Sequence, residues 1–530
     1  MLHIYRVEAV KILDKSIAKQ IAGDIIKTSK PVSVRIWREN QYLGGNEMKK
    51  LIVLILASAI TLSCLAGCTT TPATTETTAA PAGTTTAAPG DTTAAVPADT
   101  TAAAVPLTGT LKIWSFTNEL QTHALAFQKA NPDVKVEYTE ISMTNGEFQT
   151  KVKAAALTDD VPDCVALEAS FVREWVESDL LADLSSLLPK AQEMGTYQNT
   201  IDVGTYDGEV RALSYQTTPG AVFYRRSLAT EYFGTDDPAK IQALMGDMTK
   251  FQDMAKVVKE KSAGNTYMVA STGDFTNLFY ANREQPWIVD DAFVIDPMVD
   301  QLMDMAKTFR TEGYEAQATQ WQEGWFAGMN DSLVDAGGSA KQVFCYFLPT
   351  WGLPYVLMQN AGDTAGDWAC INGPLPYQWG GTWVGAMKTA KSPELAKAFA
   401  EFVALDETNL TNWATGVYTN EYLKAIDPSI GELVQNPGDF VSSKVVVDKI
   451  TASFDNSDAS KFLGGENSYS GFAAAAPNVS ARLMQGSDDA IQRSFNDPLE
   501  NFVSGKMTKE EAVQAFKDAV QSEFPEIAVS

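Results

Sequence analysis

The stretch "LTGTLKIWSFTNELQTHALAFQKANPDVKVEYTEI" (residues 107–141) sets the order of elements on which the fold depends. Its piece "TLKIWSF" (residues 110–116) is rich in strand-forming residues and predicts a β-strand. A helix is expected from Asn118 until Asn131 and Pro132 end it, because proline cannot continue a helix. Residues 134–141 predict a second strand, so the unit reads strand, helix, strand.

The same alternation continues along the chain. A helix is predicted over residues 146–157, a third strand over "DCVALEA" (163–169) and a further helix over "SFVREWVESDLLADL" (170–184). Short turns between these elements predict parallel βαβ units. Ligands of such open sheets bind beyond the carboxyl ends of the strands. Residues 114–119 and 168–170 are therefore expected at a cleft.

A secretion signal is predicted upstream, over residues 48–67. It has a cationic head at Met48–Lys50, an apolar run and small residues before Cys68, which is the layout of a secretory signal. An uncleaved membrane helix is the alternative, but the run only just reaches the roughly 18 residues needed to span a bilayer. The tetrapeptide Leu65–Cys68 resembles the bacterial lipobox. This resemblance implies cleavage before Cys68, several acyl groups on that residue and an anchor on the outer face of the cell membrane.

Two further segments flank the signal. Residues 1–47 show no clear period and are interpreted as an untranslated upstream extension, with Met48 as the true start. Residues 68–106 are almost entirely Thr, Ala and Pro and predict a disordered stalk, because they offer nothing to bury. Residues 107–530 are globular. At about 420 residues they exceed the usual limit of one core, about 250–300, so two lobes are expected.

The net charge of the chain limits the kinds of partner that it can bind. Downstream of residue 67 the chain carries 31 basic and 61 acidic residues, a net charge of −30. A chain this acidic repels nucleic acid and anionic lipid headgroups. No nucleic-acid partner is expected, and the charge favours a protein that stays soluble outside the cell as a monomer.

The numbers of cysteines and histidines limit which metal sites, disulfides and catalytic groups the chain can form. His123 is the only histidine downstream of the signal and lies on or beside an apolar helical face, so a packed or half-exposed helix residue is expected. One histidine excludes a multi-histidine metal site, and no nucleophile motif accompanies it. No catalytic residue, metal or cofactor is predicted, although hydrolysis of glycosides by paired carboxylates stays open. Cys164, Cys345 and Cys370 match no zinc pattern; free buried thiols are favoured over a Cys345–Cys370 disulfide.

Several segments together resemble one family. They are "TLKIWSF" with "FQKANPDVKVEY", the segment "KVKAAALTDDVPDCVALEASFVREWVESDLLADLSSLL", "YDGEVRALSYQTTPGAVFYRRSLATEYFG", "SPELAKAFAEFVALDE", "FLGGENSYSGFAAAAPNVS" and "GKMTKEEAVQAFKDAV". In this order, behind a lipobox and a stalk, they are similar to family 1 extracellular solute-binding proteins, the sugar-capturing subunits of ABC importers. One departure is Tyr224-Arg225-Arg226, where the family frequently has Tyr-Asn-Lys.

The resemblance implies a two-lobe α/β fold of the type II periplasmic-binding-protein kind. Lobe 1 is expected over about 107–215 plus a later returning segment, and lobe 2 over about 220–400 plus part of the C-terminal region. Crossing segments form a hinge between them. The implied function is capture of a sugar or oligosaccharide by lobe closure and its delivery to the permease subunits of an ABC importer.

Sugar capture suggests which residues form the site. Sugars stack their C–H faces on aromatic rings and offer their hydroxyls to carboxylates and amides. Seven tryptophans fall between Trp287 and Trp383, several beside Pro and Gly as in loops, although core packing is the ordinary explanation for each. The predicted aromatic platforms are Trp114, Trp287, Trp351 and Trp383, with Tyr215 stacking or packing the hinge. The predicted hydroxyl contacts are Asn118, Glu119, Glu168 and Gln216, each of which could instead be a loop or capping residue.

Two alternatives remain open. The same fold could hold a peptide or a polyamine, and a cell-surface glycoside hydrolase would use paired carboxylates. Iron is disfavoured because only one histidine is available to bind it.

Overall fold

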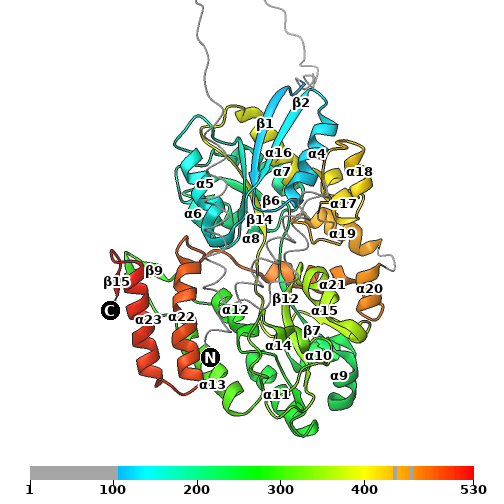
Figure 1. The fold of residues 1–530 in the computed structure, drawn as a ribbon, viewed down its shortest axis with the longest axis vertical. Coiled ribbons are helices and arrows are strands. Elements are labelled where there is room, and N and C mark those ends of the chain that lie inside the picture. The colour runs from blue at the N-terminus through cyan, green and yellow to red at the C-terminus, as the bar shows by residue number, and fades with distance from the viewer. Residues whose placement is uncertain (1–105, 434–437, 454–456, 530) are drawn as a thin grey trace, which may run out of the picture. The chain divides into compact units, whose positions relative to one another are not determined.

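A computed structural model of the chain describes residues 106–433, 438–453 and 457–529. These residues form two α/β lobes (Figure 1), so the predicted fold class is confirmed. The predicted upstream extension, the signal peptide, Cys68 and the stalk apart from Pro106 lie outside the described residues.

Lobe 1 is built on a five-stranded sheet. The strand order is β2-β1-β3-β14-β6, with β1 parallel to β2 and β3, and with β14 antiparallel to both of its neighbours. The strands are β1 (Gly109–Ser115), β2 (Val134–Glu140), β3 (Cys164–Glu168), β6 (Ala212–Ser214) and β14 (Thr382–Ala386). The three strands predicted from the opening sequence are confirmed to within two residues at each end.

Helices cover both faces of this sheet. Leu111 and Ile113 of β1 are fully buried on the face packed by α4 and α16. They belong to the main hydrophobic core of the lobe. His123 is fully buried on α4, which is the packed position of the two that the sequence allowed. The helices of lobe 1 are α4 (Glu119–Ala130), α5 (Glu147–Ala155), α6 (Val172–Val176), α7 (Leu188–Glu193), α8 (Gln198–Val203), α16 (Pro393–Leu405), α17 (Glu407–Ala414), α18 (Asn420–Lys424) and α19 (Lys444–Ala452), and β4 (Thr205–Tyr206) pairs with β5 (Glu209–Val210).

The helix predicted over residues 170–184 is much shorter than expected. Helix α6 ends at Val176, because the Arg211 guanidinium donates to the carbonyls of Val176 and Ser178 at 2.9 and 2.8 Å. The Leu180 amide, which would have closed the next turn, donates to the Ser178 hydroxyl instead. A partner distant in the sequence therefore ends a helix that the local pattern favoured.

Lobe 2 contains a three-stranded antiparallel sheet of order β12-β7-β13. Its strands are β7 (Gly220–Arg225), β12 (Cys345–Pro349) and β13 (Trp368–Ile371). Cys345 pairs with Tyr224 on one side of β7, and Cys370 pairs with Phe223 on the other. The two cysteines are thus about 9–10 Å apart, two strand spacings, which is too far for a disulfide. Cys164, Cys345 and Cys370 are free and buried, as favoured above.

The remaining elements of lobe 2 surround this sheet. Helices α22 and α23 lie side by side (Figure 1), where Phe495 packs on Phe516 with ring centroids 4.6 Å apart. Thr508 and Glu511 form a capping box at the start of α23. The helices are α9 (Arg226–Phe233), α10 (Pro238–Leu244), α11 (Met248–Lys261), α12 (Gly273–Ala281), α13 (Pro297–Thr311), α14 (Glu323–Ala327), α15 (Met358–Asn360), α20 (Asp458–Phe462), α21 (Ser468–Ala475), α22 (Asp488–Val503) and α23 (Lys509–Glu523). The short strands are β8 (Thr266–Tyr267), β9 (Ile288–Val289), β10 (Ala292–Phe293), β11 (Gln342–Val343) and β15 (Ala528–Val529).

Two segments cross between the lobes, and a third runs beside them. Residues 215–219 lead from β6 to β7 and residues 372–381 return from β13 to β14, while residues 438–443 of lobe 1 pass alongside. Thr217 N donates to Phe440 O at 3.0 Å. Pro219 and Gln378 pair in an isolated antiparallel β-bridge. These main-chain contacts hold the crossings together where a hinge is expected.

Candidate functional site

A pocket of about 320 Å³ lies at the carboxyl end of β3, between the two lobes. We call it the inner pocket. Lobe 1 contributes the end of β3 and α6, and lobe 2 contributes α12, the second crossing segment and the start of α22. Its lining includes Glu168, Ser170, Tyr280, Arg283, Trp379 and Asp488. Its position agrees with the rule that ligands of open α/β sheets bind beyond the strand ends.

A buried ion pair forms one wall of the inner pocket. Arg283 Nη2 donates to Asp488 Oδ2 at 2.5 Å, and the two side chains are only 4% and 10% exposed. Arg283 also donates to the carbonyls of Tyr280 and Leu483, so it joins α12 to the segment before α22. Burial raises the pKa of Asp488 to about 6, and the Arg283 charge partly offsets this effect. The pair is therefore held rigidly by backbone contacts on both sides.

Three buried polar atoms on this wall have no partner among the described residues. They are Arg283 Nε, Asp488 Oδ1 and the Tyr280 hydroxyl oxygen. Each of these residues is more than nine-tenths buried. A buried polar group left unpaired costs about 1–3 kcal/mol, so such groups are normally satisfied. Each of the three residues lines the inner pocket, and a movement of the wall would have to expose these atoms before a hydroxyl-bearing ligand could bind them.

Glu168 adds a carboxylate from the opposite lobe. It ends β3, and its Oε2 accepts from the Ser170 amide at 2.8 Å and from the Ser170 hydroxyl at 2.5 Å. Burial raises the pKa of Glu168. The turn after β3 thus fixes one carboxylate oxygen and holds the group in the pocket wall.

Three tryptophans form a cluster that continues from the inner pocket. Trp379 lines the pocket and lies 5.4 Å from Trp351 and 5.7 Å from Trp321, centroid to centroid. Trp351 and Trp321 stack at 6.2 Å with an interplanar angle of 13°. Trp321 is 42% exposed and has φ of +68°, a backbone conformation that is rare for a bulky side chain. Such strain is concentrated at functional sites.

Gly380 is needed for this tryptophan cluster to pack. Its φ is +81°, and a Cβ at this position would lie 2.7 Å from Trp351 Nε1. The same indole nitrogen donates to the Trp379 carbonyl at 2.9 Å. A side chain at residue 380 would therefore displace the ring and break that hydrogen bond.

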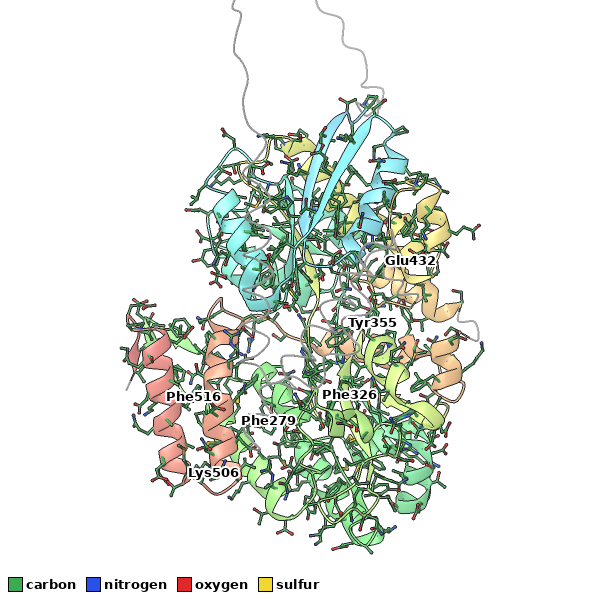
Figure 2. All side chains as sticks on the ribbon, viewed as in Figure 1. Phe279, Phe326, Tyr355, Glu432, Lys506 and Phe516 are labelled. Carbon is green, nitrogen blue, oxygen red and sulfur yellow. The ribbon has the colours of Figure 1, made fainter. Side chains whose placement is uncertain are left out.

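Glu119 joins the lobes at a second point. It begins α4 in lobe 1, and its carboxylate accepts from the Tyr215 hydroxyl at 2.9 Å and the Tyr355 hydroxyl at 3.1 Å. Tyr355 belongs to a π-helical turn of lobe 2, Leu353–Leu357, and Figure 2 labels it. Burial, with the nearby Asp439 carboxylate, raises the pKa of Glu119 to about 7. Glu119 is thus a protonatable contact between a crossing segment and both lobes.

This contact predicts a pH-dependent stability. Because the pKa of Glu119 in the folded protein lies above its ordinary value of 4.5, the folded state binds this proton more tightly than the unfolded state. The stabilisation is complete below pH 4.5 and is lost as the pH rises through 7. On going from about pH 7.5 to pH 5 the group should add about 2 kcal/mol to the free energy of unfolding.

The measurement is urea denaturation of the wild type and Glu119→Gln at both pH values. The variant keeps an acceptor for the two tyrosines and should lose this part of the pH dependence. Exposed Glu140, replaced in Glu140→Gln, serves as the control and should leave the pH dependence unchanged. Equal pH dependence in the wild type and Glu119→Gln would contradict the assignment.

The structure brings together only some of the predicted site residues. Glu168 lines the inner pocket, and Trp351 packs on Trp379 beside it. Glu119 and Tyr215 meet at the hinge. Gln216 is buried there as well, and its amide donates to Asp439 at 2.9 Å.

The other predicted residues lie away from the inner pocket lining. Trp114 is half-buried against the second apolar cluster of lobe 1, and Asn118 is half-buried just before α4. Trp383 is buried in β14, and its indole donates to the Thr200 carbonyl at 2.9 Å. Trp287 is fully buried in the core of lobe 2, where Phe293 stacks on it and the Arg283 guanidinium lies 5.5 Å from its ring.

Sequence reasoning missed Arg283, Asp488, Tyr280 and Trp379. The first two are 205 residues apart and meet only through the tertiary fold. Trp379 stood in "YQWGGTWVG", whose Gly-rich context was a usable signal.

Two kinds of feature were not found among the described residues. Within residues 106–433, 438–453 and 457–529 there is no group of His, Cys, Asp and Glu arranged to hold a metal ion. In the same part of the chain no helix is long and apolar enough to cross a membrane.

Comparison with known proteins gives a family and a fold. Residues 123–426 match the family described as "Bacterial extracellular solute-binding protein". A crystal structure described as an extracellular solute-binding protein family 1 is similar, with a TM-score of 0.63, 18% identity and coverage of 78% of this chain and 99% of that chain. A comparison with curated proteins gave no match.

Two sugar-binding proteins are also similar in structure. The sugar-binding protein MalE from Xanthomonas citri has a TM-score of 0.59 and 15% identity, over 77% of this chain and 95% of that chain. The ABC transporter associated binding protein from B. animalis subsp. lactis Bl-04, in complex with β-1,6-galactobiose, has a TM-score of 0.55 and 18% identity, over 80% and 100%. At these identities the likeness shows the fold. Together with the family match over more than half of its length, it shows that the chain belongs to the bacterial extracellular solute-binding proteins.

Proposed function

We propose that this protein captures a sugar or oligosaccharide in the inner pocket and delivers it, chemically unchanged, to an ABC importer. The observation that carries the proposal is the inner pocket between the lobes, which is lined by the polar residues Glu168, Arg283 and Asp488 beside Trp379 of the tryptophan cluster. Sugar hydroxyls would hydrogen-bond to the polar side chains, and an indole would pack against a C–H face of the sugar.

Lobe closure would strengthen these contacts. Glu168 comes from lobe 1, and the Arg283–Asp488 pair from lobe 2, so a ligand touching both ties the lobes together. Removing water from the pocket strengthens each hydrogen bond and makes a missing one costly. Acylation at Cys68 would tether the protein to the outer face of the cell membrane, where it would meet the permease subunits as a monomer.

Binding without catalysis is part of the proposal. Glu119 and Asp439 are a close acidic pair, yet each already accepts hydrogen bonds from the protein. Glu119 accepts from two tyrosines, and Asp439 accepts from Trp413 Nε1 at 2.7 Å and Gln216 Nε2 at 2.9 Å. Such engaged carboxylates suit a structural role better than the acid and base roles of a glycosidase.

A thermal-shift screen of the purified protein carrying Cys68→Ser tests the function. The panel contains monosaccharides, neutral and charged oligosaccharides, spermidine and short peptides. A glycan at one hundred times its Kd should add about 2.7 kcal/mol to the stability of the folded state, and chromatography should recover it unaltered. A shift with spermidine or a peptide alone would overturn the sugar assignment, and a cleaved glycan would overturn the assignment as a binder.

A further inference from the structure

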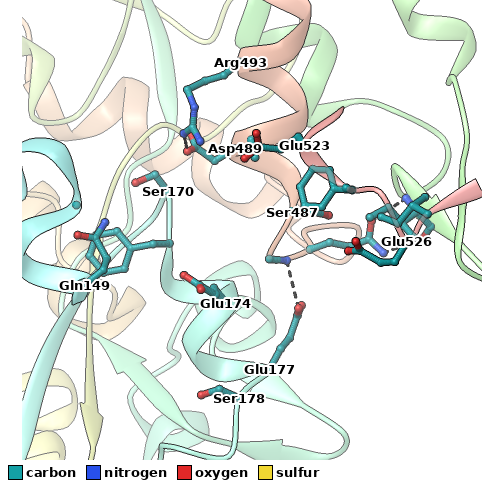
Figure 3. A pocket seen from close by; sticks show the side chains of 18 of the residues that line it. Gln149, Ser170, Glu174, Glu177, Ser178, Ser487, Asp489, Arg493, Glu523 and Glu526 are labelled. Carbon is teal, nitrogen blue, oxygen red and sulfur yellow. Dashed lines mark hydrogen bonds and ion pairs between the residues drawn. The ribbon is translucent and has the colours of Figure 1, made fainter. Parts of the chain in front are cut away.

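A second, larger cavity adjoins the inner pocket. It has a volume of about 1010 Å³ and lies between α5 and α6 of lobe 1 and the α22–α23 region of lobe 2 (Figure 3). We call it the outer groove. Three residues, Ser170, Gln485 and Asp489, line both the inner pocket and the outer groove. The two spaces therefore lie side by side and share part of their walls.

Volume sets how much ligand the combined site can hold. Small-molecule sites usually measure about 300–1,000 Å³. The inner pocket is at the small end of this range, and the outer groove is at its upper end. A ligand confined to the inner pocket would leave the neighbouring outer groove unused.

The lining of the outer groove is polar and strongly acidic. Its charged residues are Glu174, Glu177, Asp489, Glu523 and Glu526, against the single cation Arg493, which pairs with Asp489. Figure 3 shows these side chains around the groove, together with Gln149. The buried Oε1 atom of Gln149 has no hydrogen-bond partner among the described residues.

Two of the carboxylates are available to a ligand. Glu174 pairs with Lys153, and Glu177 pairs with Arg173 at 2.9 Å. Glu177 Oε2 also accepts from Gly486 N at 3.2 Å, a contact drawn in Figure 3. Glu523 and Glu526, at the end of α23 and just beyond it, are exposed and make no hydrogen bond or ion pair within the described part of the chain.

We infer that the ligand is a non-acidic oligosaccharide of roughly three or more units, with one end in the inner pocket and the rest along the outer groove. This inference rests on the proposed function. Carboxylates accept hydrogen bonds from sugar hydroxyls and tolerate amino sugars, whereas they repel uronic acids and sulfated sugars. The length of the outer groove would select the number of sugar units in the ligand. The carboxylates of the groove would select against acidic sugars.

A glycan array tests both halves of this inference. It carries malto-, cello- and chitosan oligosaccharides as mono- to hexasaccharides, C6-oxidised uronate versions of the neutral chains, and the glycans of the thermal-shift panel at graded lengths. The bound series should gain at least about fivefold in affinity from disaccharide to tetrasaccharide. Its uronate version should bind at least about tenfold more weakly at low salt, with a smaller difference at high salt.

Variants of the outer groove provide the second measurement. The double variant Glu523→Gln/Glu526→Gln removes two unpaired charges and should reduce the uronate penalty at least about threefold without changing disaccharide binding. The matched control Asp253→Asn/Glu260→Gln removes two exposed charges from α11, outside both cavities, and should change neither.

The outcomes separate the two proposals. If no glycan on the array binds, the proposed function fails. If a glycan binds with equal affinity at every length, or if its uronate version binds equally well, the proposed function stands and the inference about the outer groove is overturned. Loss of the uronate penalty in the α11 control as well would also overturn it, because general charge repulsion would then explain the effect.

Discussion

The variant Arg283→Ala is expected to lose about 3–5 kcal/mol of unfolding free energy and to bind sugar at least about 100-fold more weakly. The variant leaves Asp488 buried beside the inner pocket without its counter-ion, which is the costly way to break a buried pair. It also removes two hydrogen bonds that tie α12 to the segment before α22. Urea denaturation and isothermal titration calorimetry measure the two effects.

Arg493→Ala is the matched control for stability. Arg493 also lies on α22 and pairs with an aspartate, Asp489, but its side chain is 62% exposed. Exposed pairs contribute about 0–1 kcal/mol, so this variant should differ little from the wild type. Equal losses in the two variants would contradict the role of burial.

A double variant separates stability from binding. Arg283→Met/Asp488→Leu removes both charges, so no isolated charge remains in the pocket wall. Its stability should recover towards that of the wild type, while its sugar affinity should stay low. Recovery of affinity in this variant would show that the pair does not contact the ligand.

The second large effect is expected for Trp379→Ala. Trp379 is half-buried, lines the inner pocket and supports the other two rings of the tryptophan cluster. Aromatic residues of this kind contribute about 2 kcal/mol or more at binding sites, so affinity should fall at least about 30-fold. Calorimetry with the sugar found by the screen measures it.

Trp321→Ala and Trp379→Phe are the comparisons. Trp321 belongs to the same cluster but does not line the inner pocket, so its loss should change affinity much less. Trp379→Phe keeps a flat ring and should lie between the alanine variant and the wild type. A greater loss in Trp321→Ala than in Trp379→Ala would place the sugar outside the inner pocket.

Local patterns predicted the fold well where neighbours in the sequence decide the structure. The strands at 109–115, 134–140 and 164–168 and the helix from Glu119 all depend on nearby residues, and all are confirmed. The helix predicted over 170–184 was too long because Arg211, which ends it, lies far along the chain.

The candidate site was less predictable because distant residues assemble it. Glu168 was found from its position at the end of a strand, which a sequence reveals. Arg283 and Asp488 become partners only when the fold brings the end of α12 and the start of α22 together. Trp287, flanked by proline, resembled a cleft residue, yet Phe293 and Phe516 from other parts of the chain cover its ring.

The place of β14 in the sheet of lobe 1 affects how the protein folds during synthesis. This strand lies between β3 and β6, yet it is made only after all three strands of the lobe 2 sheet. A nascent chain that stops before residue 382 has two unpaired strand edges, which favour aggregation. Closing so long a loop slows folding. The strands of the lobe 2 sheet can therefore pair before the sheet of lobe 1 is complete, and the β3 and β6 edges of lobe 1 stay open until β14 is made.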